Sequence, residues 1–198
     1  SIIKLHNPKN IGNFKSDFYR RLAFDEILAS FLISSEIRKK IKKIKKKSKK
    51  FSQQPFITTI KKLNFNLTND QNNTLKEINN DLSSKTKMFR LLQGDVGSGK
   101  TIVALISALN VIESGCQVAL MAPTEILAMQ HYKLAKNLFS KKINLEILTS
   151  KTEYIKKKEI HREISNKKIN MIFGTHSLFQ KKINFFNLGY IIIDEQHK

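Results

Sequence analysis

Short apolar runs alternate along most of the chain with amphipathic stretches of helical spacing. The apolar runs predict five strands, at 89–93, 117–122, 145–149, 169–173 and 189–194. The amphipathic stretches predict four helices, at 69–82, 100–114, 124–138 and 153–166, the second of them closed by Gly115 as a C-terminal cap. Apolar strands separated by helices are typical of a parallel sheet whose two faces are covered. The pattern therefore predicts an α/β fold.

The first part of the chain has a different pattern. Apolar residues at helical spacing predict one amphipathic helix over 15–37, and residues 38–50 then hold ten basic residues in thirteen. The run is read either as a solvated stretch of charge or as an arm that binds nucleic acid. Pro55 marks a joint, so we predict two domains: a helical linker with the lysine-rich run at 1–55, and a second domain at 56–198.

Charge changes this picture, because 36 Lys and Arg residues against 16 acids give a net charge of +20. Such a charge attracts polyanions, although a genome with AT-rich codons would also inflate lysine. The single cysteine, Cys116, forms no intrachain disulfide and favours a reducing cytosol. The sequence has no apolar run of membrane-spanning length and no secretory signal at its start. It lacks an initiator methionine and stops at Lys198, so we expect a fragment of a longer protein.

One loop carries the clearest chemistry. Residues 94–101 read G-x-x-x-x-G-K-T between a predicted strand and a predicted helix, which is the context a phosphate-binding loop requires. Its backbone N–H groups would cradle the phosphates of ATP, Lys100 would reach the β- and γ-phosphates, and the Thr101 hydroxyl would bind Mg²⁺. The predicted nucleotide-binding residues are Gly94, Asp95, Val96, Gly97, Ser98, Gly99, Lys100 and Thr101.

Two carboxylates follow the last apolar run. Asp194 and Glu195 stand at the carboxyl end of a predicted strand, where ligands gather in open parallel sheets. We predict that Asp194 binds the magnesium ion, either directly or through a bound water, and that Glu195 polarises the attacking water, which makes Lys100 and Glu195 the catalytic pair. Without the phosphate loop, the same Asp-Glu pair is read as an ordinary solvated turn.

Four motifs together resemble the RecG family of ATP-dependent DNA helicases, which belong to helicase superfamily 2. They are Asp194-Glu195-Gln196-His197, the extended phosphate loop from Arg90, Met121-Ala122-Pro123-Thr124-Glu125-Ile126-Leu127-Ala128, and Gly174-Thr175-His176-Ser177-Leu178. The resemblance runs from about His6 to His197 and implies a RecA-like helicase ATP-binding domain at 56–198, cut after its D-E-x-H motif. It also implies a linker helix through Arg21–Glu26 and a cytoplasmic protein of DNA recombination and repair.

Further roles come only from that resemblance. Pro123, Thr124, Thr175 and His176 would contact the DNA backbone, whereas the residues alone favour a helix cap at Thr124 and a turn at Gly174-Thr175. Phe65 and Gln71 would meet the adenine, although Phe65 is equally read as a core residue. Gln196 and His197 would couple the site to a second motor lobe.

The resemblance implies DNA, branched or duplex, as the partner and ATP with Mg²⁺ as the cofactors. It places a DNA-binding wedge domain upstream of this chain and the second motor lobe, with its arginine finger, downstream. The fragment alone is therefore expected to be nearly inactive. Two alternatives stay open: a translocase like the transcription-repair coupling factor, and a degenerate fragment that binds nucleotide without turnover. The chain departs from the family at Leu148-Thr149-Ser150-Lys151, where the usual glycine is absent.

Overall fold

The computed structural model describes residues 17–43, 65–179 and 183–195 of the 198-residue chain. The chain divides into two compact units. One contains the long helix α2 (Asp17–Lys43), and the other contains α4 and every element from residue 91 onward. Within the described ranges, no helix is both long enough and apolar enough to cross a bilayer.

The helix α2 is longer than the apolar pattern predicts. It continues through Arg38, Lys39 and Lys40 to Lys43, so the lysine-rich run begins inside a helix. Residues 44–50 of that run lie outside the described ranges. The apolar side chains of α2 between Leu22 and Ile37 are exposed to solvent. Ion pairs between Arg21 and Asp25 and between Lys39 and Glu36, at spacings of four and three residues, stabilise its surface.

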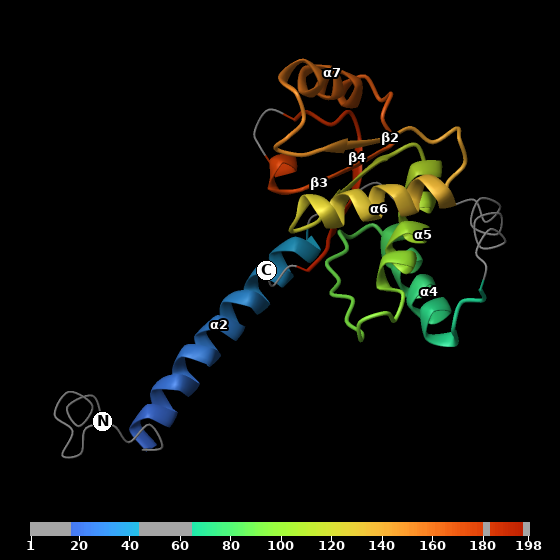
Figure 1. Ribbon diagram of the computed structural model, residues 1–198. Coiled ribbons are helices and arrows are strands. Elements are labelled where there is room, and N and C mark those ends of the chain that lie inside the picture. The colour runs from blue at the N-terminus through green and yellow to red at the C-terminus, as the bar shows by residue number, and fades with distance from the viewer. Residues whose placement is uncertain (1–16, 44–64, 180–182, 196–198) are drawn as a thin grey trace. The chain divides into compact units, whose positions relative to one another are not determined.

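From residue 100 onward the second unit alternates helices and strands, as the pattern predicts (Figure 1). The helices are α4 (Asn69–Ser83), α5 (Lys100–Glu113), α6 (Glu125–Leu138) and α7 (Tyr154–Ser165). The strands are β1 (Gln117–Met121), β2 (Leu145–Leu148), β3 (Met171–Gly174) and β4 (Leu188–Ile193), and a short 3₁₀ helix, η1 (His176–Phe179), follows β3. The predicted α/β class is confirmed.

The sheet has the order β2-β3-β1-β4, and all its pairs are parallel. Helix α7 lies on one face of the sheet and α6 on the other, because Ile172 packs in the cluster under α7 while its neighbour Phe173 meets Tyr132 of α6. Helix α5 packs against β1, β4 and α4. Since the strands are parallel, all four carboxyl ends meet at one edge of the sheet, where the predicted site residues follow them.

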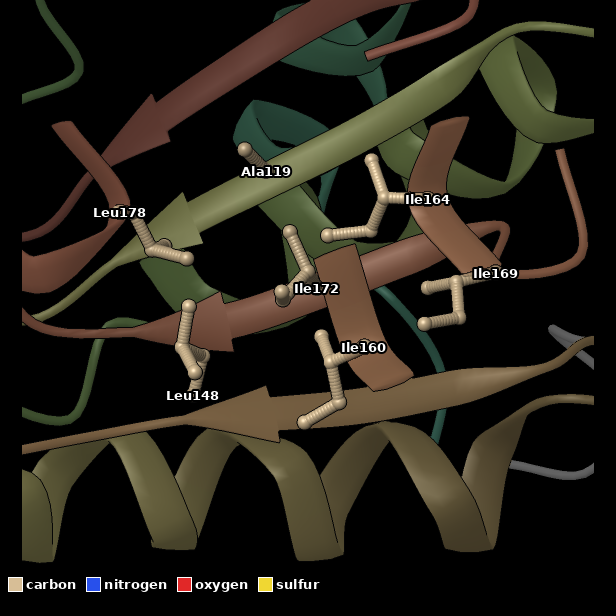
Figure 2. Close-up of a cluster of buried hydrophobic side chains, with 7 residues drawn as sticks. All are labelled: Ala119, Leu148, Ile160, Ile164, Ile169, Ile172 and Leu178. Carbon is tan, nitrogen blue, oxygen red and sulfur yellow. The ribbon is translucent and has the colours of Figure 1, made fainter. Parts of the chain in front are cut away.

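A tight apolar cluster fixes the strands under α7 (Figure 2). Ile160 and Ile164 of α7 pack onto Leu148 of β2, Ile172 of β3 and Ala119 of β1, and all five side chains are buried. Burying a side chain of the size of leucine or isoleucine contributes about 1.5–3 kcal/mol. The cluster thus ties three strands from distant parts of the sequence to one helix and aligns their carboxyl ends.

One predicted strand is wrong. Residues 89–93 form no strand in the structure, and two of their apolar side chains, Phe89 and Leu91, are 68% and 72% exposed. An apolar run becomes a strand only where a neighbouring strand takes up its backbone hydrogen bonds. In the described sheet, β4 is the last strand on its side, and it pairs with β1 alone.

A second expectation holds only in part. The strands β1 and β3 are buried, as predicted for a covered parallel sheet. Strand β4 instead alternates, and Leu188, Ile191 and Ile193 are 37–48% exposed. The apolar run in β4 is therefore not buried on both faces of the sheet.

Candidate nucleotide-binding site

The phosphate loop leads directly into α5, as predicted, but the strand predicted immediately before the loop does not form. Two of its glycines, Gly97 and Gly99, have φ of 82° and 81°, a conformation that L side chains rarely adopt. A Cβ atom at Gly94 would stand 2.8 Å from the Ser98 hydroxyl oxygen. Side chains at these glycines would strain or fill the concave backbone, so the glycines keep it open for a phosphate group.

Lys100 and Thr101 are the first two residues of α5. The Lys100 ammonium donates hydrogen bonds to the carbonyl oxygens of Gly94 and Asp95, both at 2.7 Å. The lysine side chain therefore folds back over its own loop, where a phosphate oxygen in the loop would compete for the same ammonium. Thr101, on the first helical turn, lies where the partial positive charge of the helix N-terminus favours anions.

Gln71 ties the loop to the start of α4. Its side-chain oxygen accepts from the Thr68 backbone N–H at 3.0 Å, and the Thr68 hydroxyl accepts from the Gln71 N–H, so the two residues form a capping box. Its side-chain amide donates to the carbonyl oxygen of Ser98 at 2.9 Å. The amide that the resemblance assigns to adenine is thus engaged with the phosphate loop. Phe65 is 50% exposed, which excludes the alternative that it is a core residue.

Two substitutions separate the contacts of Gln71. Gln71→Glu keeps an oxygen for Thr68 but loses the donor to Ser98, whereas Gln71→Ala loses both contacts. We expect Gln71→Ala to lower the free energy of unfolding by about 1–2 kcal/mol, because it removes two side-chain hydrogen bonds that contribute roughly 0.5–1.5 kcal/mol each, and Gln71→Glu by less. Both variants should weaken nucleotide binding, because the loop loses its tether. Urea unfolding and nucleotide titration measure the two effects, and unchanged nucleotide affinity in both variants would exclude a tether.

Asp194 and Glu195 follow β4 at the common edge of the sheet. The backbone N–H of Asp194 donates to the carbonyl oxygen of Met121 at the end of β1, at 2.9 Å. One carboxylate oxygen of Asp194, Oδ2, lies 2.7 Å from Nε2 of His131 on α6. Glu195 has φ of 47°, a left-handed backbone that is uncommon for a residue with a side chain. This turn directs the two neighbouring carboxylates differently.

These groups fit a magnesium nucleotide. The described residues contain no cluster of three or more His, Cys, Asp or Glu side chains able to hold a metal ion. Magnesium needs no such cluster, because it is usually held by one or two carboxylates together with water and substrate phosphates. A partly exposed Asp194, the Thr101 hydroxyl and a glycine loop shaped for phosphate supply that donor set.

The residues expected to contact DNA lie at the same sheet edge. Thr124 follows β1 and Thr175 follows β3, and a hydrogen bond of 2.9 Å from the Ala122 N–H to the Gly174 carbonyl joins the two strand ends. Thr124 and His176 are exposed, whereas Pro123 and Thr175 are half-buried. The Thr124 hydroxyl accepts a hydrogen bond from the Leu127 N–H at 3.3 Å and so caps α6. A helix cap is the role that the residues alone favour for Thr124. Gln196 and His197 lie outside the described residues.

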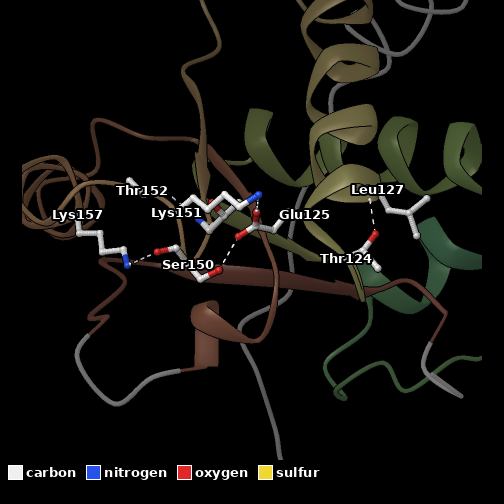
Figure 3. Close-up of polar contacts among 8 residues, drawn as sticks. Thr124, Glu125, Leu127, Ser150, Lys151, Thr152 and Lys157 are labelled. Carbon is white, nitrogen blue, oxygen red and sulfur yellow. Dashed lines mark hydrogen bonds and ion pairs between the residues drawn. The ribbon is translucent and has the colours of Figure 1, made fainter.

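The turn after β2 joins this edge through Glu125 (Figure 3). The Ser150 hydroxyl donates to one carboxylate oxygen of Glu125, and the Lys151 ammonium lies 3.4 Å from the other. The hydrogen bond from Ser150 holds the pKa of Glu125 below its usual value against the opposing effect of desolvation, and Lys151 adds to the lowering. Lys157 donates to the Ser150 carbonyl at 3.1 Å. The turn that lacks the family's glycine is thus held next to Thr124.

Sequence reasoning missed His131. The only signal was its position: it falls on the buried stripe of α6 with Ala128, Ala135 and Leu138 at helical spacing. A histidine on an apolar face needs a polar partner, and that partner, Asp194, lies 63 residues away in the sequence.

The chain is similar to known helicases. The model of the DEAD/DEAH box helicase family matches residues 68–198. The ATP-dependent DNA helicase RecG of Aquifex aeolicus is 43% identical over 203 residues, which cover 100% of this chain and 26% of the relative. RecG of Thermotoga maritima is 42% identical and covers 98% of this chain and 25% of its own length. RecG of Borreliella burgdorferi is 44% identical, with coverages of 98% and 28%.

A solved structure gives the same similarity. The structure of RecG bound to a three-way DNA junction superposes with a TM-score of 0.82 at 43% identity, and the alignment covers 90% of this chain and 25% of that one. The chain therefore spans about a quarter of the length of the curated relatives it matches.

Proposed function

Because this chain belongs to the DEAD/DEAH box helicase family, we propose that it is the first motor lobe of a RecG-type DNA translocase. In this proposal the whole protein couples ATP hydrolysis to movement on duplex DNA and remodels branched DNA, such as stalled forks, in recombination and repair. The observation that carries the proposal is the similarity to RecG over the whole chain, motifs included, at 43% identity. A DNA substrate and the single cysteine favour a cytoplasmic location.

The chain's own residues divide the work. The N–H groups of the phosphate loop and the start of α5 hold the phosphates, and Lys100 exchanges its carbonyl partners Gly94 and Asp95 for phosphate oxygens. Asp194 and Thr101 would hold a magnesium ion, which would supply positive charge beside the phosphates. Glu195 orients and deprotonates the attacking water. Gln71 and Phe65 contact the adenine in this proposal. The amide of Gln71 also connects that contact to the phosphate loop through the carbonyl oxygen of Ser98.

The DNA backbone is proposed to lie along the loops that follow β1 and β3. Pro123, Thr124, Thr175 and His176 contact phosphates there, and their hydroxyl and backbone groups position the duplex without reading its sequence. Gln196 and His197 couple nucleotide state to the second motor lobe. Asp194 and the proposed DNA loops share one sheet edge, so we propose that the nucleotide state affects DNA affinity through that edge.

The test compares DNA structures and nucleotide states. Fluorescence anisotropy of a three-way junction and of a linear duplex of equal length is measured with the chain alone, with ADP and with a non-hydrolysable ATP analogue. We expect tighter binding of the junction by the whole protein and a response of DNA affinity to nucleotide in the chain. DNA affinity that ignores nucleotide in both, together with no DNA-stimulated hydrolysis by the whole protein, would refute the proposal.

The dependence of DNA affinity on salt concentration identifies which basic residues neutralise DNA phosphates. Each phosphate neutralised on duplex DNA gives a slope of about −0.9 in log affinity against log salt. We expect that replacing Arg38, Lys39 and Lys40 with glutamine changes this slope by less than one such contact, because the proposed contacts lie at the sheet edge. Substitution is preferable to deletion, since α2 runs through these residues. Thr175→Val serves as the comparison: it should weaken binding without changing the slope, because a hydroxyl displaces no counterion.

A slope that flattens by two or more contacts in the substituted α2 variant would show that the lysine-rich run is a DNA-binding arm. The anisotropy series over several salt concentrations distinguishes the two outcomes.

A further inference from the structure

His131 is a buried polar residue inside an apolar helix face. It lies on α6 with only 8% of its surface exposed, on the stripe formed by Ala128, Ala135 and Leu138. Its Nε2 atom lies 2.7 Å from Oδ2 of Asp194, a short separation for a hydrogen bond between nitrogen and a carboxylate oxygen. An ionised carboxylate only accepts, so the proton of this bond resides on the imidazole nitrogen.

The remainder of Asp194 is already fixed. Its backbone N–H is bound to the Met121 carbonyl, and its neighbour Ile193 pairs with Met121 in the ladder between β1 and β4. The freedom left to Asp194 is the rotation of its side chain, and the bond from His131 removes that freedom. With Oδ2 held by the imidazole, Oδ1 is the oxygen left to face a cation, and the side chain remains 31% exposed.

We propose that His131 is a positioning residue that orients the Asp194 carboxylate for the divalent cation. The inference rests on the proposed function, because it takes Asp194 as the magnesium carboxylate. The partners of metal-binding carboxylates set the direction of the ligand, and their loss typically costs 10–100-fold in metal affinity. In the described part of the chain, His131 is the sole ion-pair or hydrogen-bonding partner of the Asp194 side chain.

The position of α6 gives this contact a second consequence. The same helix begins at Glu125, directly after Pro123 and Thr124, the residues proposed to contact DNA. His131 lies on the second turn of that helix. A shift of α6 on DNA binding would therefore move the donor that aims Asp194, which links the DNA loop to the metal carboxylate through one side chain.

Three variants at position 131 and one neighbour test the inference. His131→Leu removes the donor, and His131→Gln retains an N–H group at similar reach. His131→Asn retains an amide that is too short to reach Asp194. Tyr132→Leu is the matched control on α6, because it deletes a ring that packs edge-on against Phe173, with centroids 5.8 Å apart, and leaves the bond between His131 and Asp194 in place.

The measurement is binding of a fluorescent ADP analogue by the full chain, over a magnesium titration and in excess chelator. Thermal melting is recorded for every variant. We expect the half-saturating magnesium concentration to rise about 10-fold or more in His131→Leu and His131→Asn, while affinity without metal stays within about twofold of the unsubstituted chain. His131→Gln should restore most of the magnesium response, and Tyr132→Leu should lower the melting temperature without changing that response.

Several outcomes would overturn the inference. They are an unchanged magnesium midpoint in His131→Asn, an equal loss of affinity with and without metal, and the same shift in Tyr132→Leu. If His131→Leu does not fold, the contrast between Asn and Gln decides the matter. An unsubstituted chain whose nucleotide binding ignores magnesium would refute this inference and the proposed nucleotide site together, whereas a normal response in that chain and in all variants would refute the role of His131 alone.

Discussion

Replacing Glu195 with glutamine is expected to lower ATP turnover by the whole protein by about 10²–10⁴-fold, the usual contribution of a general base. Nucleotide affinity should change little, because the proposed role of Glu195 is to act on the water and not on the bound phosphates. Glutamine keeps the size of the side chain and loses only its basicity. Steady-state phosphate release and nucleotide titration give the two quantities.

Lys100→Ala is the contrasting variant. Its ammonium is proposed to bind phosphate oxygens in the ground state, and hydrogen bonds to charged groups contribute about 1.5–3 kcal/mol each. Nucleotide affinity should therefore fall about 10-fold or more, together with turnover. Without nucleotide, the phosphate loop of this variant also loses the ammonium that bridges the Gly94 and Asp95 carbonyl oxygens. If Glu195→Gln loses as much affinity as Lys100→Ala, then Glu195 has been assigned the wrong role.

Gly174→Ala is expected to lower the free energy of unfolding by about 3 kcal/mol, at the upper end of the usual cost of overpacking. A Cβ atom at Gly174 would stand closer to the carbonyl oxygen of Leu148 than real Cβ atoms come, and 3.0 Å from the Leu178 side chain. The first obstacle is backbone in the ladder between β2 and β3, so it moves only if the two strands separate.

Gly97→Ala is the control for this prediction. Gly97 has φ of 82° but nothing within 4 Å of the added Cβ, so the variant has the cost of left-handed backbone, about 1–2 kcal/mol, without a clash. Urea unfolding of both variants at constant m-value measures the difference. A cost for Gly174→Ala no larger than that for Gly97→Ala would show that the strand pair adjusts easily.

Gly174 also changes the interpretation of the motif that contains it. The Gly174-Thr175-His176 segment was read from the sequence as either a turn or a DNA contact. In the structure, Gly174 is the residue that lets β3 end against β2, and its carbonyl accepts from Ala122 after β1. The glycine thus has a packing role of its own, and the exposed His176 and half-buried Thr175 beyond it remain candidates for DNA.

The sequence by itself specified the phosphate loop and the start of the helix after it, because both are local. A phosphate loop consists of consecutive backbone groups and the first turn of one helix, so glycine spacing followed by Lys100 and Thr101 specifies it. The alternation of apolar runs and amphipathic stretches likewise specified four of the five predicted strands and the four helices predicted beside them, α4 to α7. Such patterns reflect 3.6- and 2-residue periodicities that neighbours in sequence enforce.

Tertiary structure alone decided what depends on distant partners. Residues 89–93 have the apolar character of a strand but no strand beside them in the described sheet, and no local pattern reports that. The pairing of His131 with Asp194 spans 63 residues, and the tether from Gln71 to Ser98 spans 27. Each arises because parallel strands bring their carboxyl ends, and the helices that follow them, to one edge. The strand order β2-β3-β1-β4 sets which side chains meet there. That order depends on how the helices pack on the two faces of the sheet, and no stretch of neighbouring residues specifies it.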